Sequence, residues 1–428
     1  MRRTLGEPSV GAASAPHTLT QRLHGIAGDH VDTPLYMAAG GPKCSLPSRR
    51  KRRTRRMLQS SVAAITILAS VLAIAFLVAP EPQMVASAVK QAREQFSLSA
   101  TAVSVNESVG AVLFAHERGA SFGPSRHQSA RPMMVSDALP ITRAAASAML
   151  EGEGPTHSGM QRVYISAGDG GFHEAQVRVD EVEGEGTSLV VLDATGQRFM
   201  SWFVPSGSCC QAGEGPPWTF WKYRGSDQVA GRWADVIEAR DEEKHRVARW
   251  WVDPGSGLVL WSERYGADGA PTIMSGFKDI QIGKAHLAQD HVQLVSMNPV
   301  SSTGSKGWCT GLPQCPASLA GLPLVTHASS SSVRGERSMR LFYSDGFRSV
   351  SVVWSEGQLP GAKPIQDHAA GFPDVAVWQV GDGIVSVASN GSPEMLQEAS
   401  SQLPGEQLWD PSVLERIGRG LSRLAGIN

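Results

Sequence analysis

One uncharged apolar stretch, residues 57–79, constrains this chain more than any other feature of its sequence. It reads MLQSSVAAITILASVLAIAFLVA and is preceded directly by SRRKRRTRR. A helix rises about 1.5 Å per residue, so this stretch is long enough to cross a hydrocarbon core of roughly 30 Å. Positive charge flanking a span stays on the cytoplasmic side. We therefore predict a transmembrane helix over 57–79, with the N-terminus in the cytoplasm and everything after it extracytoplasmic.

Two other interpretations of this stretch are a buried core helix and a cleaved signal peptide. Core helices are rarely apolar on every side over such a length. A signal peptide has a short basic region and a cleavage site of small residues, whereas here residues 1–56 precede the stretch and PEPQ follows it. We favour an uncleaved signal anchor that makes the chain a single-pass protein of the cell membrane.

The charge of the chain divides at this stretch. The net charge is −1, but residues 1–56 hold eleven Lys and Arg against three Asp and Glu, a charge of +8. The remaining residues hold 28 against 37, a charge of −9. The basic segment is also rich in Gly, Pro, Ser and Ala, which predicts a disordered cytoplasmic tail. Beside a membrane span its charges suit anionic headgroups, so we predict no nucleic-acid partner.

Composition shifts divide the rest of the chain into four parts. Residues 80–136 are typical of an extracytoplasmic spacer, although AVKQAREQF within them could be a short helix. A helix is predicted over 136–152, and from Met160 onward apolar strands alternate with Gly and Asp turns. Strands in succession without helices between them indicate an antiparallel meander. We predict one domain over 137–300, a linker over 301–333, and a second domain over 334–428 that ends in an amphipathic helix at 410–426.

The sequence offers no convincing catalytic or metal-binding pattern. It contains no HExxH, CxxC or calcium loop. Residues 119–123 formally match a nucleophile elbow around Ser121, but that motif needs a strand before it and a helix after it. We predict that the chain is not an enzyme and has no catalytic residues, no metal ligands and no cofactor.

The cysteines fall on both sides of the predicted membrane. Cys44 lies in the basic tail, whereas the other four are predicted to be extracytoplasmic, where disulfides persist. Cys309 and Cys315 are close enough in sequence to bridge a short loop, and they form our candidate disulfide. Cys209 and Cys210 rarely bond each other as neighbours, and the connectivity of the four stays open.

Tryptophan is concentrated in the first predicted domain. Seven of the eleven tryptophans lie between residues 202 and 261. Side chains alternate along a strand, so Trp250 and Trp251 must point to opposite faces of the sheet. Either helices or the second domain cover the outer one, or it belongs to an apolar groove for a lipid or a partner segment. The candidate residues of such a groove are Trp218, Phe220, Trp250, Trp251 and Trp261.

Several turn and strand motifs, in their order, resemble a known family. Residues 227–283 contain VAGR, then WVDPGSGLVL, then YGADG, and this stretch resembles the N-terminal domain of the MucB/RseB regulators of sigma-E type factors. Upstream, ITRAAASAM and GMQRVYIS are similar to the opening helix and first strand of that domain. Downstream, LFYSDGFRSV, VWQVGDGIVSVAS and QLPGE resemble the C-terminal domain. The resemblance covers roughly 137–428, and the chain is similar to a membrane-anchored version of the family.

The resemblance implies both a fold and a function. The implied fold is α+β: a curved, unclosed antiparallel half-barrel sheet with helices, like the lipoprotein carriers LolA and LolB, followed by a smaller α+β domain. Family members bind the outer segment of a membrane anti-sigma factor and control its proteolysis in the envelope stress response, and some respond to lipid. The alternative function is a lipid- or lipoprotein-binding carrier that uses the apolar groove of the sheet.

Overall fold

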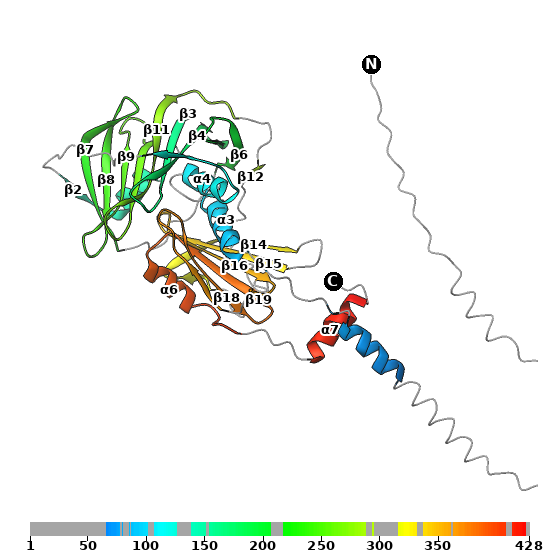
Figure 1. Cartoon of the computed structure of the whole chain (residues 1–428). Helices are drawn as coiled ribbons and strands as arrows, with labels where there is room; N and C mark the ends of the chain where they lie inside the picture. The colour runs from blue at the N-terminus through cyan, green and yellow to red at the C-terminus, as the bar shows by residue number, and fades with distance from the viewer. Residues whose placement is uncertain are drawn as a thin grey trace, which may run out of the picture. The chain divides into compact units, whose positions relative to one another are not determined.

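The computed structural model describes residues 66–77, 79, 85, 87–101, 107–125, 138–150, 154–206, 217–287, 293–294, 316–331, 337–360, 363–407 and 413–424. The chain divides into two units, residues 1–69 and 70–428. The second unit contains two sheets, antiparallel except where β12 pairs with β6, and the helices packed on them (Figure 1).

The first sheet has twelve strands and is open. Its strands follow the order β12-β6-β5-β4-β3-β11-β10-β9-β8-β7-β2, with β1 paired to β4 outside this path. The strands are β1 (Gly123–Ser125), β2 (Leu139–Ile141), β3 (His157–Ser166), β4 (Phe172–Val182), β5 (Gly186–Leu192), β6 (Arg198–Pro205), β7 (Thr219–Val229), β8 (Arg232–Arg240), β9 (Arg246–Val252), β10 (Val259–Tyr265), β11 (Pro271–Ile282) and β12 (Gln293–Leu294).

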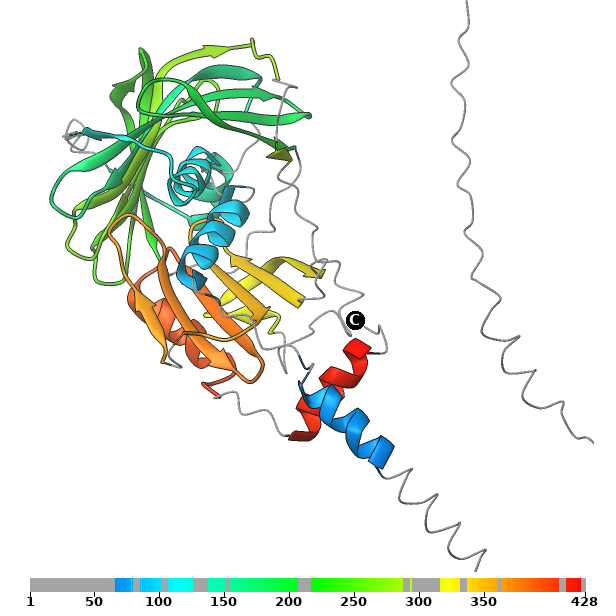
Figure 2. The same cartoon turned by 45° about the vertical axis from the view of Figure 1, so that its right-hand side comes forward.

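This sheet consists of two antiparallel meanders joined side by side. β3 to β6 form one and β7 to β11 the other, and β3 pairs with β11 where they meet. The end strands β12 and β2 do not pair with each other, so the sheet curls without closing (Figure 2). The predicted antiparallel meander and the curled, unclosed half-barrel are confirmed. The quoted DPGSG and YGADG segments are the turns of the β9–β10 and β10–β11 hairpins.

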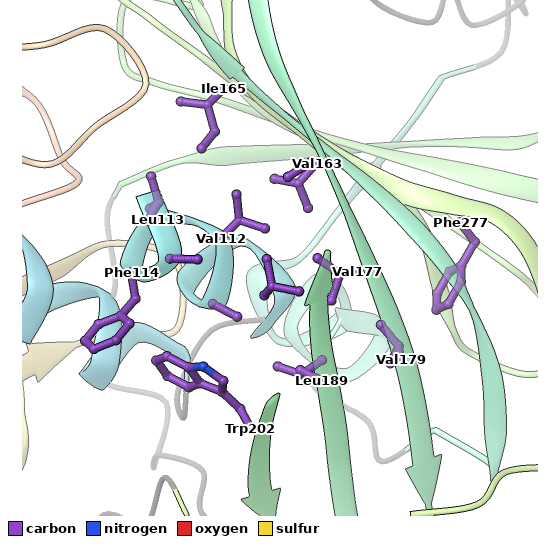
Figure 3. Packing of buried hydrophobic residues seen from close by; sticks show 14 of the residues in the cluster. Val112, Leu113, Phe114, Val163, Ile165, Val177, Val179, Leu189, Trp202 and Phe277 are labelled. Atoms are coloured by element: carbon purple, nitrogen blue, oxygen red, sulfur yellow. The ribbon is translucent and has the colours of Figure 1, made fainter. Parts of the chain in front are cut away.

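Two helices pack on this sheet, each over a different part of it. α4 (Glu107–Glu117) covers β3 to β6, and α5 (Arg143–Leu150) packs on β7 and β9. Figure 3 shows Val112 and Phe114 of α4 pointing towards Val177 and Trp202 of the sheet. The rings of Phe114 and Trp202 meet edge to face at 4.9 Å between centroids. Helix α5 begins later than predicted because Thr142 caps it: its Oγ1 accepts the Ala145 N–H at 3.2 Å.

The second sheet has seven strands in the order β13-β14-β15-β16-β19-β18-β17. Its hairpin turns include SDGF between β15 and β16 and GDG between β18 and β19. The strands are β13 (Ser318–Leu319), β14 (Leu322–Ser331), β15 (Arg337–Ser344), β16 (Ser349–Glu356), β17 (Ile365–Asp367), β18 (Asp374–Val380) and β19 (Gly383–Ser389).

One helix covers each face of the second sheet. α6 (Pro393–Ser401) packs with its Met395 and Ala399 against one face. Its N-terminus is capped by Ser392, whose Oγ accepts the Met395 N–H at 3.4 Å. α3 (Ala88–Thr101) packs against the other face with Phe96 among Phe342, Val377 and Ala388.

The prediction of a spacer over 80–136 is wrong for residues 88–117. α3 and α4 both lie inside that range, pack against each other and supply one helical layer to each sheet. The buried stripe of α3 repeats every four residues, at Ala88, Ala92, Phe96 and Ala100. Three of these four residues are alanines, whose small side chains give a weak apolar signal in the sequence. α4 is apolar on nearly every side, which is typical of a buried helix.

The predicted span 57–79 is described only at residues 66–77 and 79. Residues 66–77 form an uncharged apolar helix. None of the helices in the described ranges is both long and apolar enough to cross a membrane. The basic tail and residues 301–315 of the predicted linker lie outside the described residues. The linker predicted over 301–333 is wrong for residues 318–331, which contain β13 and β14 of the second sheet. The last helix, α7 (Val413–Leu424), falls within the amphipathic helix predicted at 410–426.

Candidate functional site

The two neighbouring tryptophans of β9 lie on opposite faces of the first sheet, as predicted. Trp250 is opposite Ile237 on β8, while Trp251 is opposite Val236. Trp250 belongs to the apolar cluster formed with α5, and Trp251 belongs to a different one. Both are buried, with 7% and 0% of their surfaces exposed.

Three of the five candidate groove residues converge on one side chain of the second sheet. Trp218, Phe220 and Trp250 surround Phe347, which lies in the turn between β15 and β16. Their ring centroids lie 5.7, 5.9 and 5.5 Å from that of Phe347. Phe347 therefore occupies the aromatic cluster of the first sheet and is itself 5% exposed.

The turn that carries Phe347 is fixed by its own hydrogen bonds. Asp345 Oδ1 accepts the N–H groups of Phe347 and Arg348 at 2.9 and 2.8 Å. Gly346 has a φ of +88°, a conformation that favours glycine and lets the chain reverse here. The Phe347 side chain is thereby presented away from its own sheet.

Two arginines of the first domain hold this turn. Arg264 on β10 donates from Nη2 to the carbonyl oxygen of Phe347, and the guanidinium of Arg143 lies 5.6 Å from the centre of the Phe347 ring. Burial lowers the pKa of Arg264 to about 10, while the nearby Asp345 opposes this shift. Arg264 stays protonated at neutral pH, so a buried cation anchors the contact between the two sheets.

A second loop of the C-terminal sheet contacts α3 and α4. The Phe372 ring lies 4.7 Å from the His116 ring of α4, and Arg93 of α3 donates from Nε to the Pro373 carbonyl at 3.3 Å. Burial lowers the pKa of His116, and the charges of His173 and Arg93 lower it further. The two sheets are thus joined at two aromatic contacts.

The other two candidate groove residues lie on the opposite face. Trp251 and Trp261 are cross-strand partners of β9 and β10. Trp251 donates from Nε1 to Asp227 Oδ2 at 2.9 Å, and Trp261 donates from Nε1 to Glu263 Oε1 at 3.0 Å. The five candidates therefore do not share one surface. A groove that binds lipid or a partner segment remains a prediction.

A buried carboxylate lies near these tryptophans. Glu238 is fully buried, and its oxygens accept hydrogen bonds from Arg240, Arg246 and Arg249 at 2.6, 3.1 and 2.6 Å. Burial alone would raise the pKa of Glu238, but Arg249 and Arg240 outweigh this effect and hold its pKa below the usual value. The arrangement is an ion-pair network across β8 and β9.

The described residues contain one group with metal-ligand chemistry in the turn between β8 and β9. The ligand atoms of Asp241, Glu243 and His245 lie within 4.8 Å of one another. Asp241 Oδ1 already accepts the His245 backbone N–H at 2.7 Å, so this carboxylate stabilises the turn. The group lies at the surface, and we do not assign a metal to it.

Ser121, the centre of the formal elbow motif, lies between α4 and β1. A helix precedes it and a strand follows, which is the reverse of the order that a nucleophile elbow requires. The candidate disulfide Cys309–Cys315, together with Cys44, Cys209 and Cys210, lies outside the described residues.

Phe347 is a contact residue that was not predicted from the sequence. Its only local signal was the turn sequence SDGF, which places an aromatic side chain at the tip of a hairpin. Hairpin tips usually face water, so an aromatic residue there indicates a contact with another part of the molecule.

Neither a protein-family model nor a curated protein sequence matches the chain. Solved structures similar to it include the crystal structure of MucB in complex with MucA(peri), with a TM-score of 0.43 and 17% identity over 61% of this chain and 96% of that one. The Pseudomonas aeruginosa MucA/MucB complex matches with a TM-score of 0.41 and 16% identity, over 59% of this chain and 94% of that one. A crystal structure of MucB matches with a TM-score of 0.37 and 16% identity, over 60% of this chain and 96% of that one. These neighbours are MucB structures and MucA complexes at low identity and partial coverage.

Proposed function

We propose that the chain is a membrane-anchored extracytoplasmic regulator that binds the outer segment of a membrane anti-sigma factor. Occupancy of that segment would block its proteolysis sterically. The observation that carries this proposal is the position of the MucB/RseB-like motifs. DPGSG and YGADG form hairpin turns of an open antiparallel sheet, and SDGF and GDG form hairpin turns of a second, helix-backed sheet.

The open sheet offers a physical means of binding an extended partner segment. Its end strands β2 and β12 are short, with three and two residues. Backbone groups of the neighbouring strands therefore extend beyond these pairings, and an added strand could use them. An outer segment held in this way is ordered along its length and is a poor protease substrate.

The direct experiment is co-purification of the full chain with candidate membrane anti-sigma factors, followed by a cleavage assay in reconstituted membranes. We expect a complex at micromolar concentration and slower cleavage of the bound anti-sigma factor. No complex, or cleavage at the same rate, would contradict the proposal. Trp233→Ser and Phe199→Ser form a matched pair of variants at exposed aromatic residues, which are 56% and 38% exposed. They test which part of the sheet contacts the partner.

The proposed location has its own test. Carbonate extraction should leave the chain in the membrane, and an impermeant maleimide should label Cys44 only after the cells are permeabilised. Labelling of Cys44 in intact cells would reverse the proposed orientation.

A lipid- or lipoprotein-binding carrier is the second candidate. The aromatic cluster of Trp218, Phe220 and Trp250 favours it, because these side chains would form an apolar site if Phe347 moved away. Mass spectrometry of lipid extracted from the purified chain tests this candidate. The Phe347→Ala variant should carry more lipid than the wild-type chain if the cluster is the site.

A further inference from the structure

Exposed large apolar side chains are concentrated on two helices of the described chain. Nine of the twelve that the described residues contain lie on the helix 66–77 and on α7. Those on 66–77 are Ile67, Leu68, Val71, Ile74 and Leu77, and those on α7 are Val413, Leu414, Leu421 and Leu424. Helices at the surface of a water-soluble protein do not normally expose so many large apolar side chains.

α7 separates apolar and charged residues along its length. At 100° per residue, its apolar positions fall within one arc of about 100°. These positions are Val413, Leu414, Ile417, Leu421 and Leu424. The charged positions fall on the other side and comprise one glutamate and three arginines, Glu415, Arg416, Arg419 and Arg423. The helix is amphipathic, with a basic polar side.

α7 contacts the helix 66–77 without covering its own apolar arc. Gly420 is buried against Ala75, and a Cβ at Gly420 would lie only 1.7 Å from the Ala75 carbonyl oxygen. The guanidinium of Arg416 lies 4.6 Å from the centre of the Phe76 ring. Gly420 lies beside the apolar arc and Arg416 lies on the charged side, so the arc stays exposed, and Leu414 is 80% exposed.

The covering partner must satisfy both the apolar arc and the arginines. An anionic lipid bilayer does so, because its interface combines acyl chains with negative headgroups. Ala75 and Phe76 are near the end of the uncharged segment 57–79 that is distant from the basic run 49–56. In the proposed anchor they would lie where the chain leaves the membrane on its outer side.

We infer that α7 is an interfacial helix that lies in the outer surface of the membrane, beside the end of the anchor. The inference rests on the proposed anchoring of residues 57–79. With twelve residues, α7 is about 18 Å long and cannot cross a bilayer. The extracytoplasmic part of the chain is thereby attached to the membrane at both of its ends. Such double attachment suits a protein that binds the membrane-proximal segment of another membrane protein.

Hydrogen–deuterium exchange of the full chain in nanodiscs tests the inference. The nanodiscs contain either phosphatidylcholine with phosphatidylglycerol or phosphatidylcholine alone. The variants Leu414→Asp and Leu421→Asp place a charge in the apolar arc. Ser422→Asp is the matched control, since it places the same charge next to Leu421 but on the polar side of the helix.

We expect amides of 413–424 to exchange roughly tenfold more slowly in the wild-type chain and in Ser422→Asp than in the two leucine variants. Protection should be stronger with phosphatidylglycerol. Equal exchange in all four chains would overturn the inference, and so would protection that depends on two copies per nanodisc rather than on lipid. A chain that does not enter nanodiscs would contradict the anchoring itself, which separates the two failures. Loss of partner binding with protected α7 would contradict only the anti-sigma factor proposal.

Discussion

At the scale of single residues, the ion-pair network around Glu238 is a buried electrostatic interaction on which the first sheet depends. A carboxylate with no exposure is costly unless it is paired and hydrogen-bonded. Here three arginines from β8 and β9 supply the pairing. Arg249 has 11% side-chain exposure, while Arg240 and Arg246 have 35% and 37%. Glu238 therefore cross-links two strands in a way that depends on its charge.

We predict that Glu238→Gln lowers the free energy of unfolding by roughly 2–3 kcal/mol. This loss is at or below the lower end of the free-energy range for breaking a buried ion pair, because two of the arginines keep contact with water. The folded-state pKa of Glu238 is lowered, so its stabilisation is present above the usual pKa of 4.5 and is lost as the pH falls through the folded value. In urea titrations at several pH values, the free energy of unfolding of the variant should lack this acid-dependent contribution. Glu243→Gln, at a site with 79% side-chain exposure, is the control and should change little.

Phe347 makes a different kind of contribution, through packing between the two sheets. We predict that Phe347→Ala costs about 3–4 kcal/mol, typical of removing a buried aromatic ring. Tryptophan emission should also shift to the red, because Trp218 and Trp250 lose a neighbour. Phe199→Ala, at a residue that is 38% exposed, should cost under about 1 kcal/mol in the same urea titration. Equal costs for the two variants would show that Phe347 is not part of the core.

At the scale of elements, a helix or strand can be predicted from the sequence when nearby residues determine it. The β9–β10 and β15–β16 hairpins are predicted because Gly and Asp turns between apolar runs determine them locally. The start of α6 is also determined locally, because Ser392 caps it and Pro393 begins it. α3 and α4 were assigned to a spacer because their alanines carry little hydrophobicity and each needs a distant sheet to bury it. The contact of Phe347 with Trp250 joins distant segments, so no local pattern could reveal it.

The pairing of α3 with α4 depends on a glycine. A Cβ on Gly110 of α4 would lie 2.4 Å from Thr101 Oγ1 and 2.8 Å from Thr101 N on α3. In an isolated helix, Gly→Ala stabilises by about 1 kcal/mol. We predict the opposite sign here: Gly110→Ala should destabilise the chain by roughly 1–3 kcal/mol, because the helices must move apart.

The control for this prediction is Gly123→Ala in β1, where nothing lies within 4 Å of an added Cβ and the φ angle is not positive. Its stability should change by less than about 0.5 kcal/mol. Both variants are compared by their urea unfolding midpoints. A Gly110→Ala variant more stable than the wild-type chain would mean that α3 and α4 do not pack as closely as the structure has them.

At the scale of the whole molecule, the second unit is held together where both sheets meet α3 and α4. His116 of α4 lies 6.0 Å from the His173 ring of β4 and contacts Phe372. Arg93 of α3 bridges to the second sheet through Asp367 and Pro373. Two titratable carboxyls, Glu117 and Asp374, flank the same junction. A change of protonation here affects the contact between the sheets rather than either sheet alone.

The pKa of His116 is lowered by burial first and then by His173 and Arg93, whereas burial raises the pKa values of Glu117 and Asp374. The folded state holds His116 neutral, so stability falls as the pH drops from above 6.5 and levels off below the lowered folded value. The two carboxyls act in the opposite direction. Their pKa values are raised in the folded state, so they add stability as the pH falls from these raised values towards the ordinary values of 4.5 and 3.8. We predict that His116→Gln removes part of the loss in unfolding midpoint between pH 7.5 and 5.5. His245→Gln, at an exposed histidine with 59% side-chain exposure, should keep the wild-type slope. A slope unchanged by His116→Gln would place the pH dependence at another group with a lowered pKa in the folded state, such as His157, whose pKa is lowered by burial.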